Sequence, residues 1–308
     1  MENNLKFYLD KALKEHFALG AFNFFNMESL QAIIDASLKT NSPAIMQVSE
    51  SALRYMGEDF VTSLAKTAKK FNPALFLHLD HGKSFEICKK AVDLGFDSVM
   101  IDGSDLSFSQ NESLTKKVAL YAHSKGVLVE GELGQIKGVE DDVDVAANSF
   151  TSPEKALEFV KKTNVDMLAV AIGTSHGINK FSRPPCLRVD LLQQIEKLLP
   201  CTPLVLHGAS TIDKEIVKTF NDFGGKLEKA NGLSQELLKK IVKEHNIAKV
   251  NTDSDLRLSF TSQLRKELSE NRSEFNPRSY LDKAREKTAQ ILVYKMENVF
   301  YSAQKKQP

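Results

Sequence analysis

Short apolar segments alternate with amphipathic segments along almost the whole chain, and this alternation constrains the fold more than any other feature. Eight segments have the composition of buried strands: 20–24, 44–49, 74–81, 98–104, 127–134, 167–173, 203–210 and 249–255. Eight more have helical periodicity: 27–40, 58–71, 84–94, 110–125, 153–163, 189–198, 213–223 and 234–245. Strands that are apolar nearly throughout are covered on both faces, as in parallel sheets. Eight strand–helix units in 308 residues predict a single (β/α)8 TIM barrel, with an open doubly wound sheet as the structural alternative.

The chain continues beyond the eighth unit. Two further helices are expected at 255–269 and 277–303, and no low-complexity linker precedes them. We therefore interpret 1–308 as one catalytic domain with a C-terminal helical extension of about 255–308, which covers the barrel or a partner subunit. The loops 135–152 and 173–190 are longer than barrel geometry needs, which is typical of lids and substrate contacts.

Composition narrows the class of protein. Lys and Arg total 41 against 40 Asp and Glu, so charge predicts neither a nucleic-acid nor a membrane partner. The 3 cysteines (Cys88, Cys186 and Cys201) lack metal-type spacing and favour a reducing compartment. The N-terminal segment lacks the apolar core of a signal peptide, and no apolar run approaches the length of a membrane span. We expect a cytoplasmic protein.

Three of the strand-like segments lead into a His-Gly pair, at His81, His176 and His207, and none of the other histidines is followed by glycine. The carboxyl ends of barrel strands meet at one rim. Three neutral imidazoles with an open fourth position are typical of a catalytic zinc site. The sequence therefore predicts that these three histidines bind zinc.

Other polar side chains are expected at the same rim. Each alone would more often be a hydrogen-bonded structural group, but their convergence favours a site. Asp80 could exchange a proton with a metal-bound substrate oxygen, or could cap a helix or orient a ligand. Glu132 and Asp102 could be further oxygen ligands or could orient an imidazole. His78, two residues before Asp80, is interpreted as a core histidine.

Glycines and small polar residues beside the histidines indicate a phosphate site. Gly177 and the segment 208–210 offer backbone N–H groups at strand-to-helix turns. Lys180 and Arg257 could supply positive charge, and the eighth strand ends in short hydrogen-bonding side chains. The loops after the last two strands of barrels are frequent phosphate sites.

From about residue 20 to 260 the chain resembles the class II, zinc-dependent fructose-bisphosphate aldolases. The matching motifs, in the family's order, are GAFNFFNME, LHLDHG, SVMIDGS, VEGELG, AIGTSHG, LVLHGAS and KVNTDSDLR. The resemblance implies that zinc bound by the three histidines polarises the C2 carbonyl of fructose 1,6-bisphosphate and stabilises the enediolate left by cleavage. The products would be dihydroxyacetone phosphate and glyceraldehyde 3-phosphate. Glu132 and Asp102 match positions tied to alternative metal binding.

The resemblance also implies roles for other residues. Asp80 matches the acid/base acting on the C4 hydroxyl, and Glu140 matches the residue that moves a proton on dihydroxyacetone phosphate. Ser49 and Arg257 match contacts to the second phosphate, with Arg257 reaching in from the partner in a homodimer or homotetramer. A monovalent cation, Na⁺ or K⁺, is implied near the first phosphate. The ketose half and its phosphate would be held by Gly177, Lys180, Gly208, Ser210, Asn251, Asp253 and Ser254.

Several alternatives stay open. Ser51 and Asp105 depart from the family pattern and leave the substrate in doubt between fructose 1,6-bisphosphate and tagatose 1,6-bisphosphate or another ketose bisphosphate. A Schiff-base aldolase is disfavoured because no lysine is expected at the carboxyl end of a core strand. A zinc hydrolase would usually carry a His-x-His pair on its first strand, and a non-catalytic sugar-phosphate binder would be expected to lack a ligand or Asp80.

Overall fold

The predicted barrel is confirmed by a computed structural model, which describes residues 4–140, 143–145, 149–176, 187–228 and 230–307, with the backbone alone at 4, 137–140, 143–145 and 176. Eight parallel strands close in the order β1-β11-β10-β8-β5-β4-β3-β2. The strands are β1 (Leu19–Asn23), β2 (Ala44–Ser49), β3 (Leu75–Gly82), β4 (Ser98–Ile101), β5 (Leu128–Leu133), β8 (Met167–Val170), β10 (Leu204–Leu206) and β11 (Ile247–Thr252).

Helices follow the strands at the predicted places, because start signals and apolar periodicity agree locally. Ser152 caps α7 and is followed by proline, and Asp213 caps α9. The helices between the barrel strands are α2 (Met27–Thr40), α3 (Glu50–Met56), α4 (Glu58–Phe71), α5 (Phe85–Asp93), α6 (Phe108–His123), α7 (Pro153–Thr163), α8 (Val189–Leu198), α9 (Lys214–Asp222) and α10 (Gln235–Glu244). The short α3 was not predicted. It begins where the Ser49 side chain accepts a hydrogen bond from the Ala52 N–H.

The amino-terminal end of the barrel is closed by α1 (Asn4–Glu15). Leu5, Tyr8 and Leu9 of this helix are buried in one apolar cluster with residues near the beginnings of the strands, among them Leu19 and Phe76. The apolar face of α1 therefore covers the amino-terminal end of the barrel.

Two predicted loops contain short strands. Within 135–152, β6 (Lys137–Glu140) pairs antiparallel with β7 (Val143–Val145). Within 173–190, β9 (Ser175–His176) pairs parallel with β6, so the two long loops are joined in a small separate sheet. These strands were not predicted, because they are too short to give an alternating apolar pattern.

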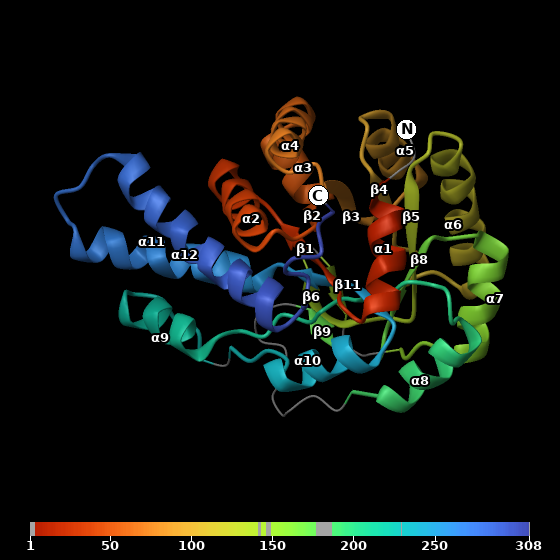
Figure 1. Ribbon diagram of the computed structural model, residues 1–308. Coiled ribbons are helices and arrows are strands. Elements are labelled where there is room, and N and C mark those ends of the chain that lie inside the picture. The colour runs from red at the N-terminus through yellow and green to blue at the C-terminus, as the bar shows by residue number, and fades with distance from the viewer. Residues whose placement is uncertain (1–3, 141–142, 146–148, 177–186, 229, 308) are drawn as a thin grey trace.

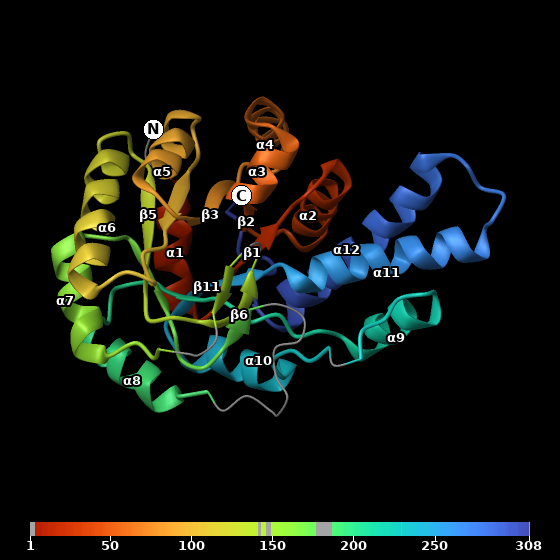
Figure 2. The same cartoon turned by 180° about the vertical axis from the view of Figure 1, so that it is seen from behind.

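Two helices follow the barrel, as predicted, although the second ends earlier than residue 303. The helices α11 (Ser254–Glu270) and α12 (Pro277–Asn298) lie side by side and extend away from the barrel (Figures 1 and 2). The outer surface of the barrel contacts them through α2, which packs on α12, and α9, which packs on α11. Among the described residues, no helix is both long and apolar enough to cross a membrane.

Candidate active site

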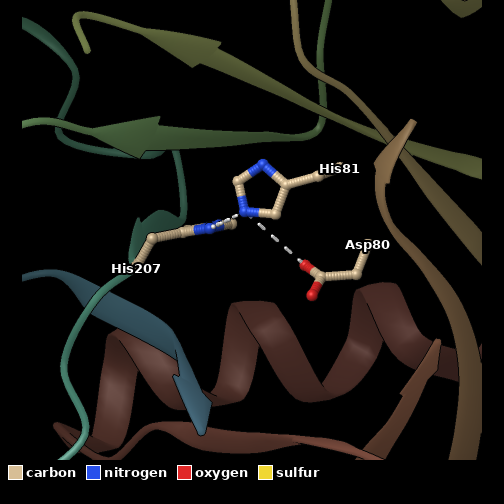
Figure 3. Close-up of side chains that lie close together, drawn as sticks. All are labelled: Asp80, His81 and His207. Atoms are coloured by element: carbon tan, nitrogen blue, oxygen red, sulfur yellow. Dashed lines mark hydrogen bonds and ion pairs between the residues drawn. The ribbon is translucent and has the colours of Figure 1, made fainter. Parts of the chain in front are cut away.

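A break in strand β3 brings two consecutive residues, Asp80 and His81, to the same site. In a regular strand their side chains would point to opposite faces. The pairing of β3 with β4 shifts register between Leu79 and Gly82, and His81 has φ +49°, in the left-handed region that β-strands do not use. Both side chains therefore point toward His207 (Figure 3). Backbone strain of this kind persists where the surrounding structure enforces it and is common at functional sites.

Buried carboxylates fix the orientation of the two histidines. The Nδ1 of His81 lies 2.9 Å from Oδ2 of Asp102, and the Nε2 of His207 lies 2.7 Å from Oε1 of Glu130. An ionised carboxylate only accepts hydrogen bonds, so each of these ring nitrogens carries the proton. In a neutral imidazole the other nitrogen then carries a lone pair.

Those two lone pairs face each other. The Nε2 of His81 and the Nδ1 of His207 are 2.8 Å apart, and Oδ1 of Asp80 lies 3.9 Å from the same Nε2. Burial lowers the pKa of His207, which favours the neutral ring. Two lone pairs and a carboxylate directed at one point repel one another unless a proton or a metal ion lies between them. The donor set therefore fits a metal ion, and a second possible group is formed by His81, Asp102 and Glu132.

Asp80 is held by three side-chain amides. Asn23 and Gln47 donate to its Oδ2 at 2.8 and 3.2 Å. Asn251 donates to its Oδ1 at 3.0 Å, and within the described part of the chain the buried Oδ1 of Asn251 has no hydrogen-bond partner. The carboxylate is thus fixed at the rim beside the two histidines.

Sequence reasoning missed Asn23 and Gln47. The available signal was a polar residue in the middle of each of the apolar segments 20–24 and 44–49, because a buried polar group needs a partner.

A buried ionic network lies beneath the histidines. Lys249 of β11 has its Nζ 2.8 Å from Oε2 of Glu130 of β5, and both side chains are fully buried. Burial raises the pKa of Glu130. The charge of Lys249 and the hydrogen bond to His207 lower this pKa by more than burial raises it, so the net shift is downward. His78 is buried as predicted, and burial with the charge of Lys249 lowers its pKa.

Replacing Lys249 with methionine will lower the free energy of unfolding by about 3–5 kcal/mol, because Glu130 is left as a buried charge without its cation. Denaturant unfolding measures the change. Lys240→Met is the matched control, since that side chain is 65% exposed and its ion pair is on the surface. The double variant Glu130→Gln/Lys249→Met is expected to recover part of the loss. A single variant as stable as the control would contradict this view of the network.

The other predicted residues at this end are placed as follows. Ser49 ends β2 and its hydroxyl caps α3, Ser210 is buried in the loop after β10, and Gly208 has φ +62°. Ser254 begins α11. Nε of Arg257 donates to Oδ1 of Asp253 at 2.7 Å. All are near the carboxyl-terminal end of the barrel.

For four predicted residues the structure describes the backbone alone or nothing. Gly177 and Lys180 lie outside the described residues. The backbone puts His176 at the end of β9, opposite Gly138 of β6, and puts Glu140 at the end of β6. The predicted roles of these residues stay predictions.

A closed barrel with this donor set at its carboxyl-terminal end defines the protein as a TIM-barrel enzyme with a site suited to a metal ion. Residues 3–305 match the family model described as "Fructose-bisphosphate aldolase class-II", and the chain belongs to this family. The predicted family and lyase activity are confirmed.

The chain is similar to curated relatives and solved structures over nearly its full length. It is 43% identical to a fructose-bisphosphate aldolase of Treponema pallidum, covering 97% of this chain and 96% of the relative. It is 44% identical to that of Thermus caldophilus, covering 94% and 95%. A crystal structure of a putative fructose-1,6-biphosphate aldolase from Coccidioides immitis is 28% identical with a TM-score of 0.80, covering 99% of this chain and 98% of that one. The YdjI aldolase of Escherichia coli K12 is 27% identical with a TM-score of 0.78, covering 100% of both chains.

Proposed function

We propose that this chain is a zinc-dependent aldolase that reversibly cleaves fructose 1,6-bisphosphate to dihydroxyacetone phosphate and glyceraldehyde 3-phosphate. The observation that carries the proposal is the convergence of the lone pairs of His81 and His207 beside the carboxylate of Asp80. His176 would complete the three-histidine set. A zinc ion held there supplies a Lewis acid that polarises the ketose C2 carbonyl.

The carboxylates around the site have separate tasks. Asp102 and Glu130 orient the two histidines, and Lys249 keeps Glu130 ionised. Glu132, whose Oε2 lies 3.8 Å from Nδ1 of His81, would accompany Asp102 in a second metal position. Because these carboxylates bind Nδ1 of His81 and Nε2 of His207, Nε2 of His81 and Nδ1 of His207 would bind the metal.

Asp80 would remove the proton from the C4 hydroxyl as the C3–C4 bond breaks. Its position supports this, because it is fixed by three amides and lies 3.9 Å from a ligand nitrogen. The buried Oδ1 of Asn251 is a suitable acceptor for a neighbouring substrate hydroxyl. Glu140 would return a proton to the three-carbon product.

The phosphates would bind on either side of the metal. The first phosphate would accept hydrogen bonds from backbone N–H groups near Gly208, with a Na⁺ or K⁺ ion beside it. Ser49 and Arg257 would contact the second. Gly177, Lys180, Ser210, Asn251, Asp253 and Ser254 complete the proposed substrate contacts.

Cleavage of two epimeric substrates tests the substrate assignment. The purified enzyme is expected to cleave fructose 1,6-bisphosphate with a kcat/KM at least about tenfold above that for tagatose 1,6-bisphosphate. The two ketoses are epimers at C4, whose hydroxyl would face Asp80, so a site fitted to one would place the other's hydroxyl poorly. Trapping of dihydroxyacetone phosphate by a coupled dehydrogenase measures both rates. The reverse preference would assign the chain to tagatose bisphosphate.

We further propose a cytoplasmic homodimer or homotetramer in which Arg257 enters the partner's site. The side chain of Arg257 is 46% exposed and lies in α11, the first helix of the projecting pair. Sedimentation at assay concentration measures the assembly, and a fully active monomer would contradict it.

A further inference from the structure

The loop that follows His207 is held from outside the barrel by a buried ion pair of the C-terminal helices. Asp255, in the first turn of α11, accepts hydrogen bonds from the backbone N–H groups of Thr211 and Ile212 at 3.1 and 2.9 Å. Lys295 of α12 places its Nζ 3.0 Å from Oδ2 of Asp255 and 3.0 Å from Oγ1 of Thr211. The Lys295 and Asp255 side chains are only 3% and 4% exposed.

The ion pair stabilises an unfavourable backbone conformation. Ile212 has φ +43°, which is rare for a β-branched residue because its Cβ crowds the backbone. Two hydrogen bonds to a carboxylate, one from this residue and one from Thr211, offset the cost. The Ile212 side chain packs in a small cluster with Ile216 and Leu258, so the loop is anchored to α9 and α11.

The other side of the same loop is tightly packed. A Cβ on Gly208 would lie 2.7 Å from the carbonyl carbon of Ser175, and one on Gly232 would lie 2.5 Å from the oxygen of Ser210. That oxygen accepts a hydrogen bond from the N–H of Leu233 at 3.0 Å. Close packing against Ser175 and Gly232 therefore restricts the backbone of 208–210. Asp255 and Lys295 fix the next two residues, Thr211 and Ile212.

We propose that Lys295 is a positioning residue for the substrate phosphate. It holds Asp255, which holds Thr211 and Ile212, and these fix the backbone N–H groups of 208–210 around the anion. The projecting helix pair is then part of the phosphate site and not only a surface extension. The inference rests on the phosphate contact at 208–210 that belongs to the proposed function.

Lys295 is needed in addition to Asp255, because a buried carboxylate that loses its cation either protonates or turns toward water. Either change removes an acceptor from the two backbone N–H groups. Lys295 also contacts the Thr211 side chain directly, so its loss frees the loop at two points.

Substitutions at Lys295 test the proposal. Lys295→Met is expected to raise both the KM for fructose 1,6-bisphosphate and the inhibition constant of inorganic phosphate about tenfold. The kcat is expected to stay within about threefold, and zinc per subunit to stay unchanged, since no metal ligand moves. Lys295→Arg is expected to retain most of the phosphate affinity. The matched control is Lys283→Met, on the same helix with a 52% exposed side chain.

A second pair of variants separates positioning from stability. Asp255→Asn/Lys295→Met leaves no buried unpaired charge, so its melting temperature is expected to recover toward the wild type while KM stays raised. Thr211→Val keeps the ion pair and removes one hydrogen bond, so it is expected to raise KM by about two- to threefold. Unchanged KM and phosphate inhibition in Lys295→Met, or their return with melting temperature in the double variant, would overturn the proposal. Failure of the proposed function is distinct, because the wild-type enzyme would then not cleave the bisphosphate.

Discussion

Replacing Asp80 with alanine will lower kcat for fructose 1,6-bisphosphate cleavage by about 10²–10⁴-fold, the usual contribution of a positioned acid/base. The side chain is buried and oriented by Asn23, Gln47 and Asn251, so solvent is poorly placed to replace it. Asp80→Asn is expected to lose as much, because its NH₂ group would face the amide donors that now bind the carboxylate.

Steady-state kinetics, zinc per subunit and melting temperature are measured together for these variants. Asp59→Ala, at an exposed position in the first turn of α4, is the matched control and is expected to behave like the wild type. The two histidines keep their carboxylate partners in the Asp80 variants, so zinc content is expected to stay near the wild-type value. An Asp80→Ala enzyme with a kcat near that of the control would remove this residue from the chemistry.

The barrel could be predicted because local signals and the global fold agree. The bounds of α2, α4, α7 and α8 match the predicted helices. In α2 and α7 a side-chain cap marks the start and a left-handed asparagine marks the end, whereas α4 and α8 lack a side-chain N-cap and were predicted from their apolar period. Strand ends were placed less well. The segment 203–210 was predicted as one strand, whereas β10 spans Leu204–Leu206 and the rest forms the loop that holds His207. His207, Ala209 and Ser210 stay buried past the last strand residue, so burial does not mark the end of the strand.

The sequence predicted which residues lie near the site, but not how their side chains are arranged. Strand periodicity places Asp80 and His81 on opposite faces, and only the register shift and the positive φ of His81 bring them together. The Glu130–Lys249 ion pair joins residues 119 positions apart, and no local pattern connects them. Asp255 and Lys295, which contact the loop after β10, are likewise far from that loop in the sequence.

Removing the metal is expected to lower the cleavage rate by about 10³-fold or more, since Lewis-acid stabilisation of developing oxyanion charge is worth several kcal/mol. The lysines that contact carboxylates of the site are held in ion pairs: Lys249 in β11 is fully buried against Glu130, and Lys83, directly after β3, lies 2.7 Å from Oδ2 of Asp102. A Schiff base with substrate is therefore not expected, and borohydride treatment in the presence of substrate is expected to leave the enzyme active.

The most direct test of zinc-dependent cleavage uses one preparation of the enzyme. Its cleavage rate is measured before chelation, after chelation, and after stoichiometric Zn²⁺ is added back. Circular dichroism on the same samples shows whether the barrel stays folded. We predict that the folded, metal-free protein is inactive and that one Zn²⁺ per subunit restores cleavage. Full cleavage of fructose 1,6-bisphosphate by folded protein from which all metal has been removed would contradict the account.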